Sequence, residues 1–346
     1  MDEFKEYSQG FDAFEKIAAK FQENPLEFKR QFMPSPKQAD IAKELGGSHD
    51  PIRKLFDEYF ELAKQEDKHD EIIRCMDSII HLQETYAVNV VTSNELGEVP
   101  VSENTLKIMT LTIKGEACYK LDKHEEVIKC FDKILELDPK SVDAWNNKGN
   151  ALGVLGKKEE ALECLDKASE LDPKYGKTWS NKGVALMDLD RYEEALKCFE
   201  KATELDPKLY SAFNDKGIVL GRLDRYEEAL VCFEKATELD PKYTYAWNNK
   251  GMTLRRLGKH EESLKCFDKA IELDPTYTLV LNNMSDVLLR LDRADKALEI
   301  INKALEIDKT KALYWGTKGE ILQKLGRDDE AKECFAKENE IKIMHD

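Results

Sequence analysis

The chain has 346 residues, of which 41% are hydrophobic and 35% are charged, and its formal net charge is −16. Nucleic-acid-binding proteins normally carry a basic excess, because neutralising phosphates supplies most of their affinity, so this charge argues against DNA, RNA and anionic membranes as partners. No apolar run approaches the roughly 18 residues needed to cross a bilayer, and the acidic start lacks the layout of a signal peptide, so we expect a cytoplasmic protein.

Residues 1–52 are expected to form a separate helical module. Aromatic and small side chains recur there at helical spacing, at Phe4, Tyr7, Phe11, Phe14, Ala18 and Phe21. This stripe could anchor the chain to a membrane, bind a partner helix, or dock as a cap on the residues that follow. The nearby acidic residues Asp2, Glu3, Glu6 and Glu15 disfavour an anionic membrane, because such lipids attract basic segments.

Two further segments precede the regular part of the chain. Residues 66–79 parallel the later stretch 121–134 closely, which predicts that residues 53–86 form a degenerate copy of a repeating unit, with Phe60 where a glycine is expected. Residues 87–107 show no helical period and contain Gly97 and Pro100, which predicts a loop or linker.

The rest of the chain repeats itself every 34 residues. Glycines take one phase of this period, at Gly115, Gly149, Gly183, Gly217, Gly251 and Gly319, with Ser285 in the gap. Prolines take a second phase, at Pro139, Pro173, Pro207, Pro241 and Pro275, and all four tryptophans take a third, at Trp145, Trp179, Trp247 and Trp315. A fixed period of this length is typical of a repeat architecture.

Each unit is predicted to form two helices. Trp145, Gly149 and Leu152 lie on one face of the first helix, and Ala161, Leu165 and Ala168 lie on one face of the second. Glycine costs about 1 kcal/mol against alanine inside a helix, so its recurrence indicates a packing requirement. A Leu-Asp-Pro-Lys turn then ends the second helix, because proline cannot continue it.

The pattern Trp145, Gly149, Ala161, Ala168 and Pro173 resembles the tetratricopeptide repeat. This resemblance covers residues 108–345 and departs from the family pattern mildly, as at Lys309, which replaces a proline. It implies an all-α fold, a right-handed α-solenoid of helix-turn-helix units whose first helices line a concave face. The seven copies are 108–141, 142–175, 176–209, 210–243, 244–277, 278–311 and 312–345.

The cysteines follow the same period and allow two interpretations. Cys75, Cys130, Cys164, Cys198, Cys232, Cys266 and Cys334 share one repeat position. Free cysteine is a small apolar residue that is often buried, which favours a packing role. A redox or metal-sensing role is the alternative, although the chain has no CxxC pair.

Asparagines that follow the tryptophan position are candidate peptide-binding residues. The candidates are Asn147, Asn181, Asn214, Asn248, Asn249, Asn282 and Asn283. An asparagine side chain has a donor and an acceptor, which matches the backbone of an extended peptide of any sequence. The alternative is that these asparagines make local structural hydrogen bonds, and the sequence does not decide between the two.

A basic row at the far end of the first helices is the second candidate site. It comprises Arg222, Arg255, Arg256, Arg290 and Lys324. Guanidinium groups pair bidentately with carboxylates and phosphates, so the row predicts an acidic or phosphorylated ligand. Pairing with acidic residues on the same surface is the alternative.

The sequence therefore predicts an interaction scaffold that binds an extended, acidic segment of a protein partner in the concave face. The alternative is a regulatory sensor in which the module of residues 1–52 moves against the array or plugs it, with 87–107 as a hinge. No catalytic or nucleotide-binding signature is present, so we expect neither an enzyme nor a cofactor, and no metal site. The partner's identity and the oligomeric state do not follow from the sequence.

Overall fold

The computed structural model contains two compact units, Met1–Leu189 (unit 1) and Asp190–Asp346 (unit 2). The residues that it describes are 32–33, 55, 58–59, 61–63, 65, 67–86, 91–94, 97–100 and 103–345. The aromatic stripe of residues 4–21 and Phe60 of the degenerate copy lie outside the described residues.

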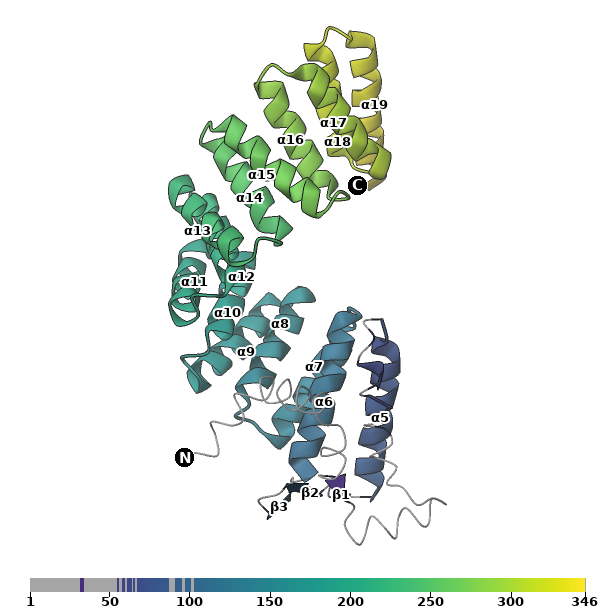
Figure 1. Ribbon diagram of the computed structural model, residues 1–346, viewed down its shortest axis with the longest axis vertical. Coiled ribbons are helices and arrows are strands. Elements are labelled where there is room, and N and C mark those ends of the chain that lie inside the picture. Colours follow the sequence, from purple (N-terminus) through teal and green to yellow (C-terminus); the bar gives the residue numbers. More distant parts are fainter. Residues whose placement is uncertain are drawn as a thin grey trace. The chain divides into compact units, whose positions relative to one another are not determined.

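Unit 1 is a stack of helices in which each described helix packs against the next (Figure 1). The helices are α5 (His69–Tyr86), α6 (Glu103–Lys120), α7 (His124–Leu137), α8 (Val142–Val154), α9 (Lys158–Leu171) and α10 (Gly176–Asp188).

Unit 2 continues the same arrangement of elements. Its helices are α11 (Tyr192–Leu205), α12 (Tyr210–Arg222), α13 (Tyr226–Leu239), α14 (Thr244–Arg256), α15 (His260–Leu273), α16 (Thr278–Arg290), α17 (Ala294–Ile307), α18 (Ala312–Lys324) and α19 (Asp328–His345). The array from α6 to α19 thus has the fourteen helices predicted, and the all-α repeat fold is confirmed. Within the units, α6/α7, α8/α9, α12/α13, α14/α15, α16/α17 and α18/α19 pack as helix pairs.

The two helices of a pair meet where the first helix carries a glycine. A Cβ atom added to Gly217 in α12 would lie 2.7 Å from Cε1 of Phe233 in α13, and one added to Gly251 would lie 2.6 Å from Cε1 of Phe267. In the second copy Leu165 takes the place of the ring, 2.8 Å from a Cβ on Gly149. The recurring glycine therefore makes room for a large side chain of the second helix, and this contact explains its recurrence.

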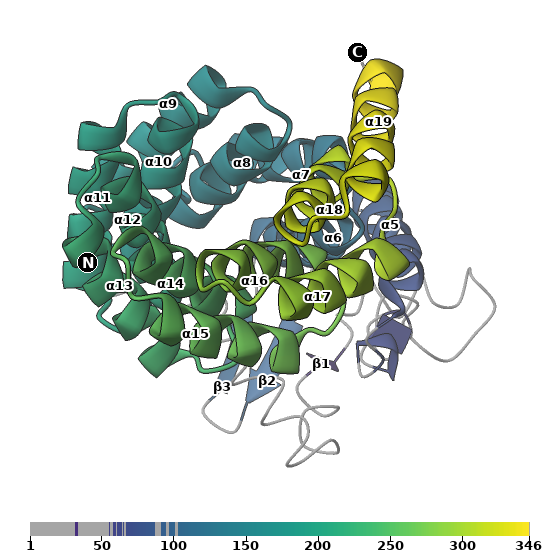
Figure 2. The ribbon, with the colours of Figure 1, turned by 90° about the horizontal axis from the view of Figure 1, so that it is seen from above.

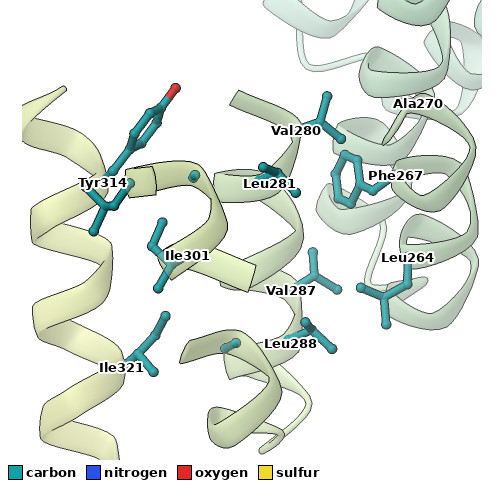
Figure 3. Packing of buried hydrophobic residues seen from close by; sticks show 13 residues of the cluster. Leu264, Phe267, Ala270, Val280, Leu281, Val287, Leu288, Ile301, Tyr314 and Ile321 are labelled. Carbon is teal, nitrogen blue, oxygen red and sulfur yellow. The ribbon is translucent and has the colours of Figure 1, made fainter. Parts of the chain in front are cut away.

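The helices from α15 to α18 share one buried core that extends across neighbouring pairs. Leu264 and Phe267 of α15, Val287 of α16, Ile301 of α17 and Ile321 of α18 belong to one buried cluster (Figure 3). Because every pair buries its apolar face against a neighbour, the repeats stabilise one another rather than folding as separate domains.

The tryptophans fix the connection from one copy to the next. The indole Nε1 of Trp145 donates to the carbonyl oxygen of Pro139 at 3.0 Å, and Trp247 donates in the same way to Pro241 at 3.0 Å. Trp315 makes the same bond at 3.0 Å to the carbonyl of Lys309. A carbonyl group is present in any residue, so the loss of proline at Lys309 leaves this interaction intact.

The segment 87–107, predicted to be a loop, instead contains a β-hairpin and the start of α6. Strands β2 (Val91–Asn94) and β3 (Gly97–Pro100) pair antiparallel, and β1 (Phe32–Met33) pairs antiparallel with β2. Asn94 lies opposite Gly97, so two residues connect the strands. β-Branched residues in this stretch favour extended backbone, a signal that the absence of a helical period alone does not separate from a loop.

Helix α5 of the degenerate copy packs directly against α6. Lys114 of α6 forms an ion pair with Asp77 of α5 at 2.5 Å, and Lys123 forms another with Asp70 at 2.6 Å. Ile73 and Ile80 of α5 pack against the core cluster of α6, α7 and α8. This packing contradicts the prediction that residues 87–107 act as a hinge, because the helices on both sides of the segment share one core.

The cysteines of the repeat position lie in the core. Cys75, Cys130, Cys164, Cys198, Cys232, Cys266 and Cys334 are all buried with free thiols. Burial raises the pKa of the Cys130 thiol to about 12, and such a thiol is a poor nucleophile because the thiolate is the reactive form. These observations support the packing interpretation of the cysteines.

Two glycines of helix α12 should respond in opposite ways to the same substitution. Gly217→Ala should destabilise the chain by about 1–3 kcal/mol, because the new methyl group collides with the Phe233 ring. Gly221→Ala should stabilise it by roughly 0.5–1 kcal/mol, because its Cβ meets no atom within 4 Å and alanine is the better helix former. Chemical denaturation of both variants checks this, and equal effects would mean that the Gly217 contact is not what fixes the pair.

Candidate functional site

The candidate site is the face on which neighbouring first helices approach one another, named the inner face here. In unit 2, α12 contacts α14, α14 contacts α16 and α16 contacts α18, whereas among the described helices the second helices make no contacts of similar extent with each other. In unit 1, α8 contacts α10 in the same way. Figure 2 shows α12, α14 and α16 on the inner side of unit 2 and α13, α15 and α17 on its outer side.

Amide hydrogen bonds join neighbouring first helices, and we name this set the asparagine ladder. Asn181 Nδ2 donates to Asn146 Oδ1 at 3.0 Å in unit 1. In unit 2, Asn249 donates to Asn214 and Asn283 donates to Asn248, both at 3.0 Å. The hydroxyl of Thr317 donates to Asn282 at 2.9 Å and takes the part of the next asparagine.

The ladder corrects part of the predicted site. Asn214, Asn248 and Asn282 are only 2–6% exposed, because their side chains lie between helices and accept the bonds of the ladder. They therefore have the structural role that was the alternative interpretation. The sequence placed them on the inner face because the family pattern locates the helix but does not show how deep a short side chain lies.

The donors of the ladder are half-buried and stay at the inner face. They are Asn181, Asn249 and Asn283, and Asn147 occupies the same repeat position. Asn283 uses its amide nitrogen in the ladder, and the described contacts give its Oδ1 no donor. Such an oxygen is available to accept a hydrogen bond from a bound peptide.

Three members of the basic row are paired with carboxylates of their own surface. Arg255 and Arg290 both donate to Asp286, the latter at 3.1 Å, and Lys324 pairs with Asp292 at 3.0 Å. Asp286 was not identified from the sequence, because its pairing with Arg255 joins neighbouring copies 31 residues apart. For these three residues the pairing alternative is correct.

Arg222 and Arg256 are the exposed members of the row without such a partner. Within the described residues neither has a hydrogen bond or an ion pair, and they end the neighbouring helices α12 and α14. A cation at the carboxyl end of a helix also stabilises the helix dipole, so both arginines have a modest structural role as well. Arg222 lies within electrostatic reach of Tyr192 and Arg256 within reach of Tyr226, but neither guanidinium group is bonded to a carboxylate among the described residues.

A stripe of large apolar residues occupies the other end of the first helices of unit 2, and we name it the tyrosine–leucine stripe. Its members are Tyr210, Tyr243, Tyr245, Tyr277, Leu279 and Leu313. The sequence interpretation missed it. The available signal was that tyrosine or leucine recurs within the first turn of four successive copies. A prediction based on polar ligand-binding residues does not use this signal.

Carboxyl groups with raised pKa lie on the first helices of both units. Desolvation, followed by the nearby charge of Asp143, raises the pKa of Glu116 to about 7, although its side chain remains exposed to solvent. In unit 2, desolvation raises the pKa of Asp215 to about 6, while a hydrogen bond from Asn214 at 3.0 Å opposes the shift. Asp215 takes the position that asparagine takes in the neighbouring copies.

Neither a metal site nor a membrane span is found in the described part of the chain. No three His, Cys, Asp or Glu side chains there come together in a way that could hold a metal ion. None of the helices in that part of the chain combines the length and the apolar character needed to cross a membrane.

The fold and the inner face define an array of helix-turn-helix repeats, and family models identify the repeat family to which the units belong. Models described as tetratricopeptide repeat match residues 142–175, 176–209, 210–243 and 244–277, residues 266–299, and residues 110–141 and 312–338. Together they cover more than half of the chain. The protein belongs to the tetratricopeptide repeat family.

Two solved structures with TM-scores above 0.5 share this fold. A tetratricopeptide repeat protein from Parabacteroides merdae ATCC 43184 has 18% identity and a TM-score of 0.53 over 68% of this chain and 93% of that chain. Pseudomonas aeruginosa pilF has 22% identity and a TM-score of 0.51 over 56% and 88%. YrrB, a TPR protein with an unusual peptide-binding site, has 29% identity and a TM-score of 0.45 over 53% and 95%. The comparison with curated proteins finds no match.

Asp215→Asn should increase the free energy of unfolding over that of the native chain, and this gain should be larger at pH 7.5 than at pH 4.5. Because the pKa of Asp215 is raised in the folded state, the unfolded chain loses this proton first, and the free energy of unfolding falls as pH rises from about 4 to about 6. The asparagine removes this loss, so the gain should be on the order of 1–2 kcal/mol above pH 7 and should vanish near pH 4.

Urea denaturation at the two pH values measures the effect. Glu306→Gln, on the exposed side of α17, reports the effect of net charge alone. A gain from Asp215→Asn that is the same at both pH values would contradict the assignment of a raised pKa to this carboxyl.

Proposed function

We propose that this protein is an interaction scaffold and that the inner face of unit 2 binds an acidic, extended segment of a partner protein. The observation that carries the proposal is the pair Arg222 and Arg256. Both are exposed at the ends of adjacent first helices, without an ion pair among the described residues, in a chain with a net charge of −16. An unpaired arginine pair in so acidic a protein is best explained by an anionic ligand.

The arrangement of the two arginines favours a segment that crosses the first helices. Neighbouring packed helices have axes about 8–10 Å apart, so Arg222 and Arg256 present two cationic groups at successive steps along the array. Each guanidinium group can hold one carboxylate through two parallel hydrogen bonds. Arg290 follows on the next first helix and, although bonded to Asp286, keeps 53% of its side chain exposed.

The half-buried asparagines supply contacts of a second kind. Asn249 and Asn283 lie between the two ends of their helices, in the middle of the inner face. Since no donor among the described residues reaches the carbonyl oxygen of Asn283, a backbone N–H group of an extended chain is a suitable partner for it. Such a contact is independent of the peptide sequence, whereas the arginines select for acidic residues.

The alternative, a sensor in which residues 1–52 move against the array, receives no support from the described residues. The hinge that it required at 87–107 is bridged by the packing of α5 on α6 and by the Lys114–Asp77 ion pair. The helical module itself lies outside the described residues, apart from Phe32–Met33, which pairs with β2.

The experiment is selection of random short peptides from a phage library on the full chain. We expect enrichment of peptides rich in Asp and Glu, and affinity that falls as salt rises, because exposed charges are screened. The variant Arg222→Glu/Arg256→Glu should bind the enriched peptides about tenfold or more weakly, since hydrogen bonds to charged groups are worth about 1.5–3 kcal/mol each.

The matched control is Lys197→Glu/Lys265→Glu, which makes the same kind of change in charge on the exposed second helices α11 and α15. Its affinity should stay close to that of the native chain once overall charge is allowed for. Equal weakening by both variants would reject the inner face as the site, and enrichment of basic peptides would reject an acidic ligand.

A further inference from the structure

The tyrosine–leucine stripe is an apolar surface of unit 2 that the proposed function leaves unused, and four of its members, the tyrosines, form a chain of ring contacts. The ring centroids of Tyr210 and Tyr243 are 5.0 Å apart, those of Tyr243 and Tyr245 are 5.8 Å apart, and those of Tyr245 and Tyr277 are 5.5 Å apart. The hydroxyl groups of Thr278 and Tyr314 lie 2.8 Å apart in the same region. The rings are thus held in place by one another before any ligand arrives.

The stripe is exposed where a folded chain normally hides such residues. Tyr245 is 58% exposed, Leu313 54%, and Tyr210 and Leu279 each 38%. Single exposed apolar residues need no explanation, but a row of them along one edge marks an interaction surface. Large aromatic side chains that are already ordered lose little conformational entropy on binding, which favours their use in recognition.

The stripe and the basic row lie on the same face of the first helices. In α14, Tyr245 is the second residue and Arg256 the last, eleven positions later, and the same spacing separates Leu279 from Arg290 in α16. At 3.6 residues per turn, eleven positions make about three complete turns, so both ends point in nearly the same direction. At about 1.5 Å per residue, the two rows are roughly 16 Å apart.

An extended peptide fits between two such rows better than a helix does. Side chains of an extended chain project alternately to opposite sides, so one set can reach the stripe while the other reaches the arginines. Its backbone then faces Asn249 and Asn283, and free N–H groups can bond to the available carbonyl of Asn283. A helix has used its backbone groups internally and gains nothing from these asparagines.

We propose that the inner face of unit 2 takes an extended partner segment in which large apolar and acidic residues alternate, with the apolar side chains on the tyrosine–leucine stripe and the acidic ones on Arg222, Arg256 and Arg290. The proposal rests on the proposed function and adds to it the pattern of the ligand. The basic row selects the acidic set by charge complementarity, and the stripe determines specificity for the other set.

Three synthetic peptides of identical length and composition test the pattern by fluorescence anisotropy with the full chain. In the first peptide Leu or Tyr alternates with Glu, in the second the same residues follow helical spacing, and in the third the apolar residues are grouped at one end. The alternating peptide should bind about tenfold or more tightly than the other two, because only it can bury several apolar side chains while keeping its ion pairs.

The variant Tyr245→Ala/Leu279→Ala/Leu313→Ala removes the exposed part of the stripe and should weaken the alternating peptide about tenfold or more. The matched control Val231→Ala/Ile307→Ala truncates exposed residues of the second helices α13 and α17 and should leave the affinity unchanged. Circular dichroism of both variants checks that the fold is retained, as expected for exposed positions.

The outcomes separate this inference from the proposed function. Tight binding of the alternating peptide that is lost in both the stripe variant and Arg222→Glu/Arg256→Glu supports both. The alternating pattern is overturned if binding is lost in the arginine variant but unaffected in the stripe variant. Equal binding of all three peptides overturns it as well. Neither of these outcomes contradicts the acidic ligand. Absence of binding by every peptide overturns both proposals.

Discussion

The hydrogen bond from one first helix to the next is the interaction on which the inner face depends. Asn283 donates to Asn248, Asn249 to Asn214, and in the other unit Asn181 to Asn146, each at 3.0 Å. A buried amide left without a partner is costly, so the ladder holds neighbouring helices in one register. Contacts such as those of Gly217 with Phe233 and Gly251 with Phe267 fix a first helix to its partner, but the ladder relates one copy to the next on the side that a ligand would meet.

Because the ladder takes up the middle of each first helix, the two ends are left for other roles. The carboxyl ends carry Arg222 and Arg256 without described partners, and the amino ends carry the exposed Tyr245 and Leu313. Asp286 neutralises part of the basic row by binding both Arg255 and Arg290. The inner face of unit 2 therefore divides into an apolar edge, an amide centre and a basic edge, and the proposed ligand follows from that division.

The array could be predicted almost completely from the sequence, and the site only in part. The period of Trp145, Gly149 and Pro173 determines where helices begin, pair and end, because each of these residues has a local role that recurs in most copies. Contacts between side chains of neighbouring copies have no comparable pattern in the sequence. The hydrogen bond that buries Asn248 joins it to Asn283, 35 positions away, and the ion pair of Arg255 joins it to Asp286, 31 positions away. Both contacts depend on how neighbouring helices are placed. The hairpin at 91–100 was missed because a short stretch without helical period can be a loop or a strand.

The most direct test of this account is a double-mutant cycle on Asn248→Ala and Asn283→Ala, with unfolding free energy and acidic-peptide affinity measured for each variant. If the asparagines join the helices, the two substitutions should show a coupling energy of about 1 kcal/mol, and the loss of peptide affinity should be confined to variants that lack Asn283. Additive effects on stability together with a loss of affinity for Asn248→Ala alone would contradict it, because Asn248 would then contact the ligand and not its neighbour.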